Sequence, residues 1–209
     1  MEIIKGLEWR YATKKFDADK KLPETELNAL KRAVQLSASS YGLQPYKVLI
    51  VTDPSVREQL LPASWNQPQI IEASHLFIFC SRLHTGATEV ATFFDRKAKV
   101  QGMEASVFEG AVSFVSGKIA EKSESDIKVW NTHQTYIAVG TLLAAAGEAQ
   151  VDACPMEGFD PKAYDTILGL TEQGLQASVV VALGYRALED DNAKAPKVRK
   201  SEADLFTIV

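Results

Sequence analysis

Four cations near the two ends of the chain are the residues best suited to hold an anion. Arg10 and Lys14 lie near the amino end, and Lys197 and Arg199 lie within the last thirteen residues. Guanidinium and ammonium groups bind phosphate oxygens through charge-assisted hydrogen bonds. Because such residues are usually solvated surface groups, a phosphate-sized site requires that folding bring the two ends together. If the first helix continues through Arg10 and Lys14, their one-turn spacing directs both toward one anion, and in an extended arm Lys197 and Arg199 would share one side.

A polar turn precedes the first strand-like run of the chain. Ser39, Ser40 and Gln44 leave hydroxyl and amide groups free to meet a polar ligand, and Gly42 favours a turn. A plain helix-to-strand connection capped by Gly42 is the alternative.

Two later segments carry groups suited to a flat heterocycle. Asn66 can donate and accept at once, as a ring edge with adjacent N–H and C=O groups requires. Gly158, in the run Pro155-Met156-Glu157-Gly158, permits a close approach of the backbone to such a ring.

The composition bounds the class of protein. A chain of 209 residues with 46% hydrophobic content builds one substantial core, so we expect a single domain over residues 1–209. The net charge of -4 argues against binding to nucleic acid or to an anionic membrane surface, and we expect a small-molecule partner. No run resembles a signal peptide or a membrane span, which favours a cytoplasmic location. Cys80 and Cys154 read as core residues, and the three histidines show no zinc-type spacing, so no metal site is expected.

Apolar periodicity predicts the elements that position these groups. A first amphipathic helix should end near Tyr11, and a second should begin near Pro23 and stop between residues 37 and 42. Short apolar runs predict strands at 48–51, 76–80, 151–154 and 177–183.

The stretch from Glu89 to Ala149 contains no proline and should end in a long buried helix. Its Gly140 and the Ala144-Ala145-Ala146 run offer a small-residue surface, used either at a subunit interface or within the core. Residues 184–209 are mostly polar but end in Leu205, Phe206, Ile208 and Val209. A disordered tail rarely ends in this way, so we expect an extended arm that packs on its own domain or on a partner subunit.

In this order, the segments resemble the nitroreductase family of FMN-dependent NAD(P)H oxidoreductases, nearest to its oxygen-insensitive nitroreductase and dihydropteridine reductase branch. The resemblance covers nearly the whole chain and rests on Arg-x-x-x-Lys, Ser-Ser-x-x-x-Gln-Pro, Asn before Ala-Ser-His, Pro-x-Glu-Gly and Pro-Lys-x-Arg. It implies an α+β nitroreductase-like fold, with a small mixed or antiparallel sheet flanked by helices. It also implies an intertwined homodimer whose carboxyl arms, residues 184–209, are exchanged.

The resemblance also implies a role for each site residue. Arg10, Lys197 and Arg199 would hold the FMN phosphate, and Lys14 would lie near the pyrimidine side of the ring. The backbone at Glu157 would lie near flavin N5. The full set of expected cofactor contacts is Arg10, Tyr11, Ala12, Lys14, Ser39, Ser40, Tyr41, Asn66, Gln69, Gln134, Pro155, Met156, Glu157, Gly158, Lys197 and Arg199.

Within that set, Asn66 would meet the polar edge of the ring, and Gln134 would approach the flavin from the long helix. Ser39, Ser40 and their neighbours would come from the other subunit. A substrate would stack over the flavin, with Tyr41 and Trp65 as aromatic neighbours.

The implied reaction is hydride transfer from NAD(P)H through flavin N5 to a nitroaromatic, quinone, pteridine or activated enone. No Gly-x-Gly-x-x-Gly turn occurs, so NAD(P)H would visit the flavin face transiently, and one pocket serving donor and acceptor in turn implies ping-pong kinetics. No side chain is assigned as the general acid, because solvent can supply the proton. A flavin-dependent dehalogenase or dehydrogenase of the same family, and a non-catalytic flavin-binding module, are the alternatives; residues 86–117 do not decide between them.

Two positions depart from the family pattern. Ala12 replaces a common serine, which removes one hydroxyl contact to the cofactor. Gln69 replaces the lysine of the nearest branch, and a cation there would stabilise the negative charge of the reduced flavin. We therefore expect slightly weaker FMN binding and a lower flavin potential than in lysine-bearing relatives, unless Lys14 dominates the electrostatics of the ring.

Overall fold

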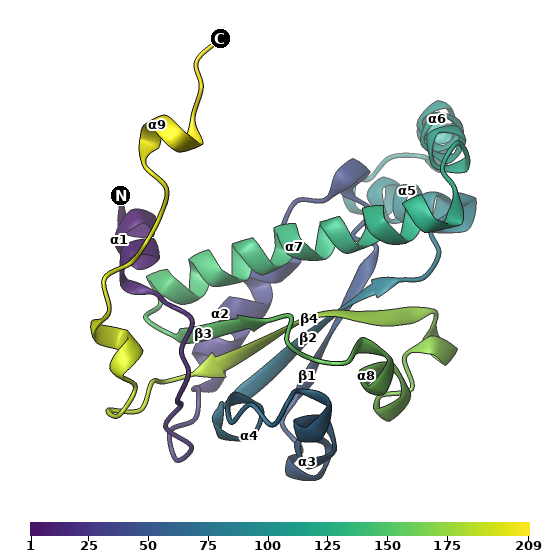
Figure 1. The fold of residues 1–209 in the computed structure, drawn as a ribbon. Helices are drawn as coiled ribbons and strands as arrows, with labels where there is room; N and C mark the ends of the chain where they lie inside the picture. The colour runs from purple at the N-terminus through teal and green to yellow at the C-terminus, as the bar shows by residue number, and fades with distance from the viewer.

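The centre of the protein is a four-stranded antiparallel sheet with the strand order β1-β2-β4-β3 (Figure 1). The structure is a computed structural model that describes residues 1–209. The strands are β1 (Tyr46–Val51), β2 (His75–Arg82), β3 (Asp152–Met156) and β4 (Leu175–Gly184). All four predicted strands are therefore confirmed, each with slightly different ends, and the sheet is antiparallel rather than mixed.

The side chains of the two central strands divide between two cores. Leu76 and Ile78 of β2 enter one apolar cluster, whereas Phe77 and Phe79 enter the other. This division follows from the two-residue period of a strand, which directs successive side chains to opposite faces. Cys80 and Cys154 are buried and unpaired, as the composition indicated.

Helices cover both faces of the sheet (Figure 1). α2 and α7 contribute to the core on one face, and α3, α4 and α8 contribute to the core on the other. α5 and α6 form a separate apolar cluster with the first part of α7. The helices are α1 (Glu2–Trp9), α2 (Glu24–Gln35), α3 (Pro54–Ala63), α4 (Gln69–Glu72), α5 (Ala87–Gln101), α6 (Glu109–Ala120), α7 (Glu124–Glu148), α8 (Pro161–Ile167) and α9 (Glu202–Leu205).

The predicted long helix is α7, and only one of its faces is buried. Leu142 and Ala146 lie in the core, whereas Tyr136, Ile137 and Gly140 are exposed. A methyl group added at Gly140 would meet no atom within 4 Å. The expectation of a buried helix thus holds for one face of α7 only. The small-residue surface at Gly140 is exposed and is not used in the core of this chain.

Helix α1 crosses α7 where two glycines meet. A Cβ atom added at Gly6 would lie 2.7 Å from the backbone of Gly147, and one added at Gly147 would lie 2.7 Å from the carbonyl oxygen of Gly6. Only glycine allows this approach of the two backbones. The crossing fixes the end of α1, and therefore the chain that follows it, at the carboxyl end of α7.

The carboxyl arm leaves its own domain (Figure 1). Beyond β4 it contains a short 3₁₀ segment (Asp191–Lys194) and the single turn of α9, so it is not extended throughout as expected. Leu205, Phe206 and Ile208 at its end are exposed. The first part of the arm packs on its own domain, where the Lys197 ammonium donates to the carbonyl oxygens of Leu7 and Arg10, whereas its apolar end remains exposed. No helix in the structure combines the length and apolar character needed to span a membrane.

Candidate functional site

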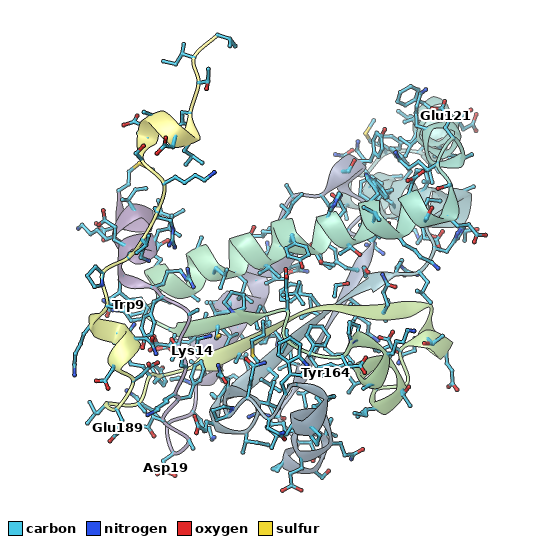
Figure 2. The ribbon with its side chains drawn as sticks, in the orientation of Figure 1. Trp9, Lys14, Asp19, Glu121, Tyr164 and Glu189 are labelled. Carbon is cyan, nitrogen blue, oxygen red and sulfur yellow. The ribbon has the colours of Figure 1, made fainter.

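The four cations from the two chain ends line one cavity of about 530 Å³. Arg10 and Lys14 follow α1, and Lys197 and Arg199 come from the arm. Pro155 of β3 lines the same cavity. Figure 2 shows Trp9 and Lys14 on the side of the molecule where the arm begins.

The segment that carries Arg10 and Lys14 is extended, so the condition under which a helical spacing would direct both cations to one anion is not met, and α1 ends two residues before the expected Tyr11. α1 ends at Trp9, Arg10 has an extended ψ of 144°, and Ala12 forms a β-bridge with Ala153. In an extended chain alternate residues share a side. Arg10, Ala12 and Lys14 line the cavity, as Tyr11 also does, whereas Thr13 is buried away from it.

The charges in this cavity repel one another. Burial lowers the pKa of Arg10, and Arg199 lowers it further. Burial also lowers the pKa of Lys197, together with the charges of Arg10 and Arg199. Glu8 is the only acid that lines the cavity. An anion placed among these groups would relieve the repulsion.

One donor in the cavity has no acceptor. The Lys197 ammonium donates to the carbonyl oxygens of Leu7, at 2.6 Å, and of Arg10. The buried Nε of Arg10 makes no hydrogen bond. Because buried polar groups are nearly always paired, this donor indicates a ligand oxygen.

A second set of polar bonds fixes the loop after α1 against β3. Asp152 accepts a hydrogen bond from the Thr13 hydroxyl and forms an ion pair of 2.7 Å with Arg186. The Arg186 guanidinium lies over the rings of Trp9, 4.2 Å from its centroid, and Tyr11, 4.6 Å from its centroid. These contacts hold the loop so that its outer side faces the cavity.

A neighbouring cavity of about 500 Å³ shares Pro155 with the first. It continues past Glu157, whose carboxylate accepts a hydrogen bond of 2.5 Å from the Tyr136 hydroxyl of α7. Burial, this bond and the carboxylate charge raise the pKa of Tyr136 to about 12. Sequence reasoning missed Tyr136, although it stands two residues beyond Gln134 on the same helix.

The Glu157-Gly158 turn offers free backbone donors. Neither of their N–H groups donates to a backbone carbonyl, while the Gln67 amide donates to the Gly158 carbonyl oxygen at 2.7 Å. A Cβ atom at Gly158 would lie 2.9 Å from the Trp65 ring. The absence of a side chain therefore allows Trp65, 71% exposed, to cover this turn. Met156, the residue before the turn, is buried in the core.

Backbone strain concentrates in the segments singled out from the sequence. Tyr41, Gln44, Trp65 and Asn66 account for four of the five non-glycine residues with positive φ. Such residues persist where the surrounding structure holds them, often at ligand sites. Asn66 is exposed, so its amide group is accessible to a ligand.

Gln69, the first residue of α4, is buried. It is 3% exposed, and its Oε1 accepts no hydrogen bond. Burial raises the pKa of the Cys154 thiol, whereas Lys14, the Gln69 amide and Arg10 act in the opposite direction. Cys154 itself lies in the apolar core and lines neither cavity.

Four predicted site residues lie elsewhere. The Ser40 N–H donates to Gln134 Oε1 at 2.8 Å, and the Tyr41 and Trp130 ring centroids are 6.5 Å apart. Ser39, Ser40, Tyr41 and Gln134 do not line the cation cavity. Gln134 and Gly147 are separated by 13 residues of α7, or about 20 Å at 1.5 Å per residue. Within one chain, Ser39, Ser40, Tyr41 and Gln134 therefore do not join the four cations in one cavity.

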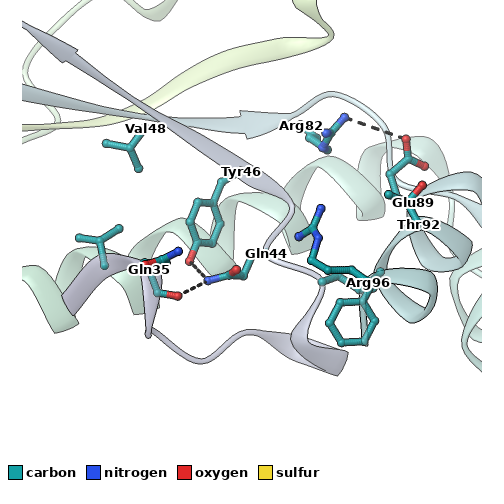
Figure 3. A pocket seen from close by; sticks show the side chains of 11 residues that line it. Gln35, Gln44, Tyr46, Val48, Arg82, Glu89, Thr92 and Arg96 are labelled. Atoms are coloured by element: carbon teal, nitrogen blue, oxygen red, sulfur yellow. Dashed lines mark hydrogen bonds and ion pairs between the residues drawn. The ribbon is translucent and has the colours of Figure 1, made fainter. Parts of the chain in front are cut away.

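A third cavity, of about 360 Å³, is lined by Gln35, Gln44 and Tyr46, among others (Figure 3). Gln44 fixes the loop there by donating to the Gln35 carbonyl oxygen at 3.0 Å, and it lies 3.4 Å from the Tyr46 hydroxyl. Tyr46 and Val48 belong to β1, whose outer edge pairs with no strand of this chain.

Known proteins resemble this chain over its whole length. A family model described as the nitroreductase family matches residues 7–185. The chain is 34% identical to a proposed NAD(P)H nitroreductase of Bacillus subtilis, YfkO, with 98% of this chain and 96% of that protein covered. It is 31% identical to the major NAD(P)H-flavin oxidoreductase of Aliivibrio fischeri, with 99% and 98% covered. A proposed nitroreductase of Exiguobacterium sibiricum, solved in complex with FMN, shares the fold with a TM-score of 0.85 at 20% identity, covering 100% of this chain and 96% of that one.

Proposed function

This chain belongs to the nitroreductase family, and we propose that it binds FMN and carries hydride from NAD(P)H to a nitroaromatic, quinone, pteridine or activated enone. The observation that carries the proposal is the cavity in which four cations from the two chain ends surround an unpaired buried donor.

The cation cavity fits the phosphate of FMN. Arg10, Lys197 and Arg199 supply guanidinium and ammonium donors to a group that carries nearly two negative charges. Each well-placed charged hydrogen bond contributes about 1.5 to 3 kcal/mol. The unpaired Arg10 Nε would gain an acceptor, and the mutual repulsion of the cations would be offset. Ala12 offers no hydroxyl, so this wall of the cavity relies on charge.

The isoalloxazine ring would extend from this cavity past Pro155 toward Glu157. The free N–H groups of Glu157 and Gly158 are donors for a ring nitrogen, and Lys14 lies on the same side of its loop as Arg10. Asn66 would bind the ring edge, and the buried Gln69 Oε1 would gain a donor. When bound, FMN supplies the hydride chemistry at its N5 atom, and the protein binds, orients and excludes water.

The substrate side of the site is aromatic and open. Trp65 is 71% exposed and Tyr41 is 44% exposed, so both can stack against a planar acceptor. The Glu157 carboxylate accepts a hydrogen bond from the Tyr136 hydroxyl, and this bond fixes the turn. Solvent would supply the proton for the product. Since NAD(P)H and the acceptor would use the same face in turn, the kinetics would be ping-pong.

A homodimer would complete the site. Gln134, to which the Ser39–Tyr41 segment is bonded, lies about 20 Å along α7 from the crossing with α1 at Gly147, so a partner related by a two-fold axis can place its copies of these residues over the cavity. The exposed α7 face at Tyr136, Ile137 and Gly140 suits such a contact, because small residues allow close helix packing.

Exchanged arms would stabilise this dimer. Each chain would contribute one domain, residues 1–209, with residues 184–209 as the arm. The exposed Leu205, Phe206 and Ile208 need a surface to cover them, and on a partner the free edge of β1 offers backbone donors and acceptors to the arm, beside a cavity that Leu43 and Val48 help to line. Light scattering should give a dimer for the full chain. Removal of residues 201–209 should shift the mass toward the monomer at low concentration, and an unchanged dimer would exclude a role for the arm.

Steady-state oxidation of NAD(P)H tests the proposed reaction. With FMN bound and menadione or a nitrofuran as acceptor, turnover should show parallel lines in double-reciprocal plots. A non-catalytic flavin-binding module would take up FMN without turnover. Intersecting lines would contradict the shared pocket.

A further inference from the structure

Asp190 lies at the root of the carboxyl arm, next to the cation cavity but not in its lining. It is 2% exposed, and it stands in the acidic run Glu189-Asp190-Asp191, which in sequence looks like solvated surface. Its carboxylate is the meeting point of two chain segments that are more than 170 residues apart.

Both carboxylate oxygens of Asp190 are fully used. Oδ2 accepts hydrogen bonds from the Tyr11 hydroxyl at 3.0 Å and from the N–H groups of Lys14 at 2.7 Å and Lys15 at 3.2 Å. Oδ1 accepts from the N–H of Asn192 at 3.2 Å and from its side-chain amide at 2.9 Å. One oxygen thus holds the loop after α1, and the other holds the arm.

We propose that Asp190 is a positioning residue of the phosphate site, which fixes the loop after α1 against the arm so that Arg10, Lys14 and Lys197 converge on one anion. Tyr11, Lys14 and Asn192 line the cavity and are all bonded to this carboxylate. The inference rests on the proposed binding of FMN.

An asparagine side chain cannot make the hydrogen bonds that the Asp190 carboxylate makes. Five donors converge on Asp190, and an acceptor at both oxygen positions is needed to satisfy them. In an Asp190→Asn variant, one position becomes an NH₂ group that faces donors. If that position is Oδ2, the loop loses its anchor, and if it is Oδ1, the arm loses its anchor. Either orientation separates the two walls that carry the cations.

A matched control is available one residue further along the chain. Asp191 has an exposed carboxylate that pairs only with Lys194, at 3.2 Å and on the surface. Asp191→Asn removes the same charge from the same short 3₁₀ segment without touching the loop. The two variants therefore separate the effect of position from that of net charge.

The test compares FMN with riboflavin, which carries the same ring but no phosphate. Fluorescence titration of the flavin-free full chain should show that the wild type binds FMN more tightly than riboflavin. Asp190→Asn should raise the Kd for FMN by about tenfold or more while the Kd for riboflavin changes less than about threefold. Asp191→Asn should leave both values within about twofold of the wild type.

Several outcomes would overturn the inference or the proposed function beneath it. An unchanged FMN Kd in Asp190→Asn would show that the carboxylate does not position the cations. An equal loss for both flavins would assign Asp190 a purely structural role. A wild type that binds flavin without preference for FMN would remove the phosphate assignment itself, whereas a wild type that binds no flavin would defeat the proposed function. Should Asp190→Asn fail to fold, Tyr11→Phe removes only one hydrogen-bond donor to Asp190. This variant should weaken the binding of FMN, but not of riboflavin, by about threefold. An equal effect on both flavins, or none, would also overturn the inference.

Discussion

Replacement of Gln69 by lysine would place a cation at a buried position that the family resemblance assigns to the flavin site. Gln69 is 3% exposed and its Oε1 has no partner, so a longer charged side chain there would be poorly screened by water. Lys14, which lines the cation cavity, is exposed by contrast. We expect Gln69→Lys to raise the flavin midpoint potential, because the reduced cofactor carries the extra negative charge.

The expected size of this rise follows from Coulomb's law. At an effective dielectric constant of about 20, two unit charges interact by about 4 kcal/mol at 4 Å and about 2 kcal/mol at 8 Å. For a two-electron couple, about 1.4 kcal/mol corresponds to about 30 mV. The potential should therefore rise by about 40 to 90 mV.

Spectroelectrochemical titration of the FMN-loaded protein measures this potential directly. Gln69→Met is the matched control: it removes the amide without adding charge, and its potential should differ from the wild type by less than about 15 mV. If Gln69→Lys binds FMN normally but its potential is unchanged or lower, Lys14 rather than position 69 sets the electrostatics of the ring. In that case our reasoning about Gln69 is wrong.

Four further outcomes are expected. Lys197→Met should raise the Kd for FMN by about 10- to 100-fold in fluorescence titrations and leave the Kd for riboflavin nearly unchanged, because one charged donor to the phosphate is lost. Equal effects on both flavins would contradict the phosphate assignment. Glu157→Gln should keep substantial turnover of NAD(P)H, because the backbone of the turn is the proposed contact; total loss with FMN bound would refute this. Gly147→Ala should lower stability by about 1 to 3 kcal/mol in thermal unfolding, as its Cβ would lie 2.7 Å from the Gly6 carbonyl oxygen, whereas Gly117→Ala, with open space, should not. Burial raises the pKa of Asp190, but hydrogen bonds from Asn192, Lys14, Lys15 and Tyr11 lower it overall from 3.8 to about 2. Its stabilising contribution is thus present above about pH 4 and lost as pH falls to about 2, and acid unfolding of Asp190→Asn should lack this component.

The strands and the long helix were predictable because burial leaves a direct mark on sequence. The apolar runs within β1, β2 and β4 are continuous or nearly so, and they marked each strand to within a few residues. The end of α1 was also predicted to within two residues, but the extended course of the chain that follows it was not predictable in this way. The spacing of Arg10 and Lys14 is compatible with a helix. The β-bridge between Ala12 and Ala153, and the hydrogen bond from the Lys14 N–H to Asp190, hold this segment extended.

The site was predictable where family motifs carry it, and not where distant contacts do. The sequence placed Arg10 and Lys197 in one pocket through resemblance, and they line one cavity. Asp190 lies within an acidic run, and nothing in the sequence separates it from its exposed neighbour Asp191. Tyr136 left only a weak signal, an aromatic side chain on the open face of α7. The roles proposed for Asp190 and Tyr136 both depend on contacts between segments that are distant in sequence and meet only in the folded chain.

The visible spectrum of the FMN-reconstituted full chain under anaerobic conditions tests the central claim most directly. The protein should retain about one FMN per chain after desalting, lose its yellow colour on addition of NADH or NADPH, and regain it when menadione is added. A chain that retains no FMN, or one whose bound FMN is bleached by neither nucleotide, would contradict the account.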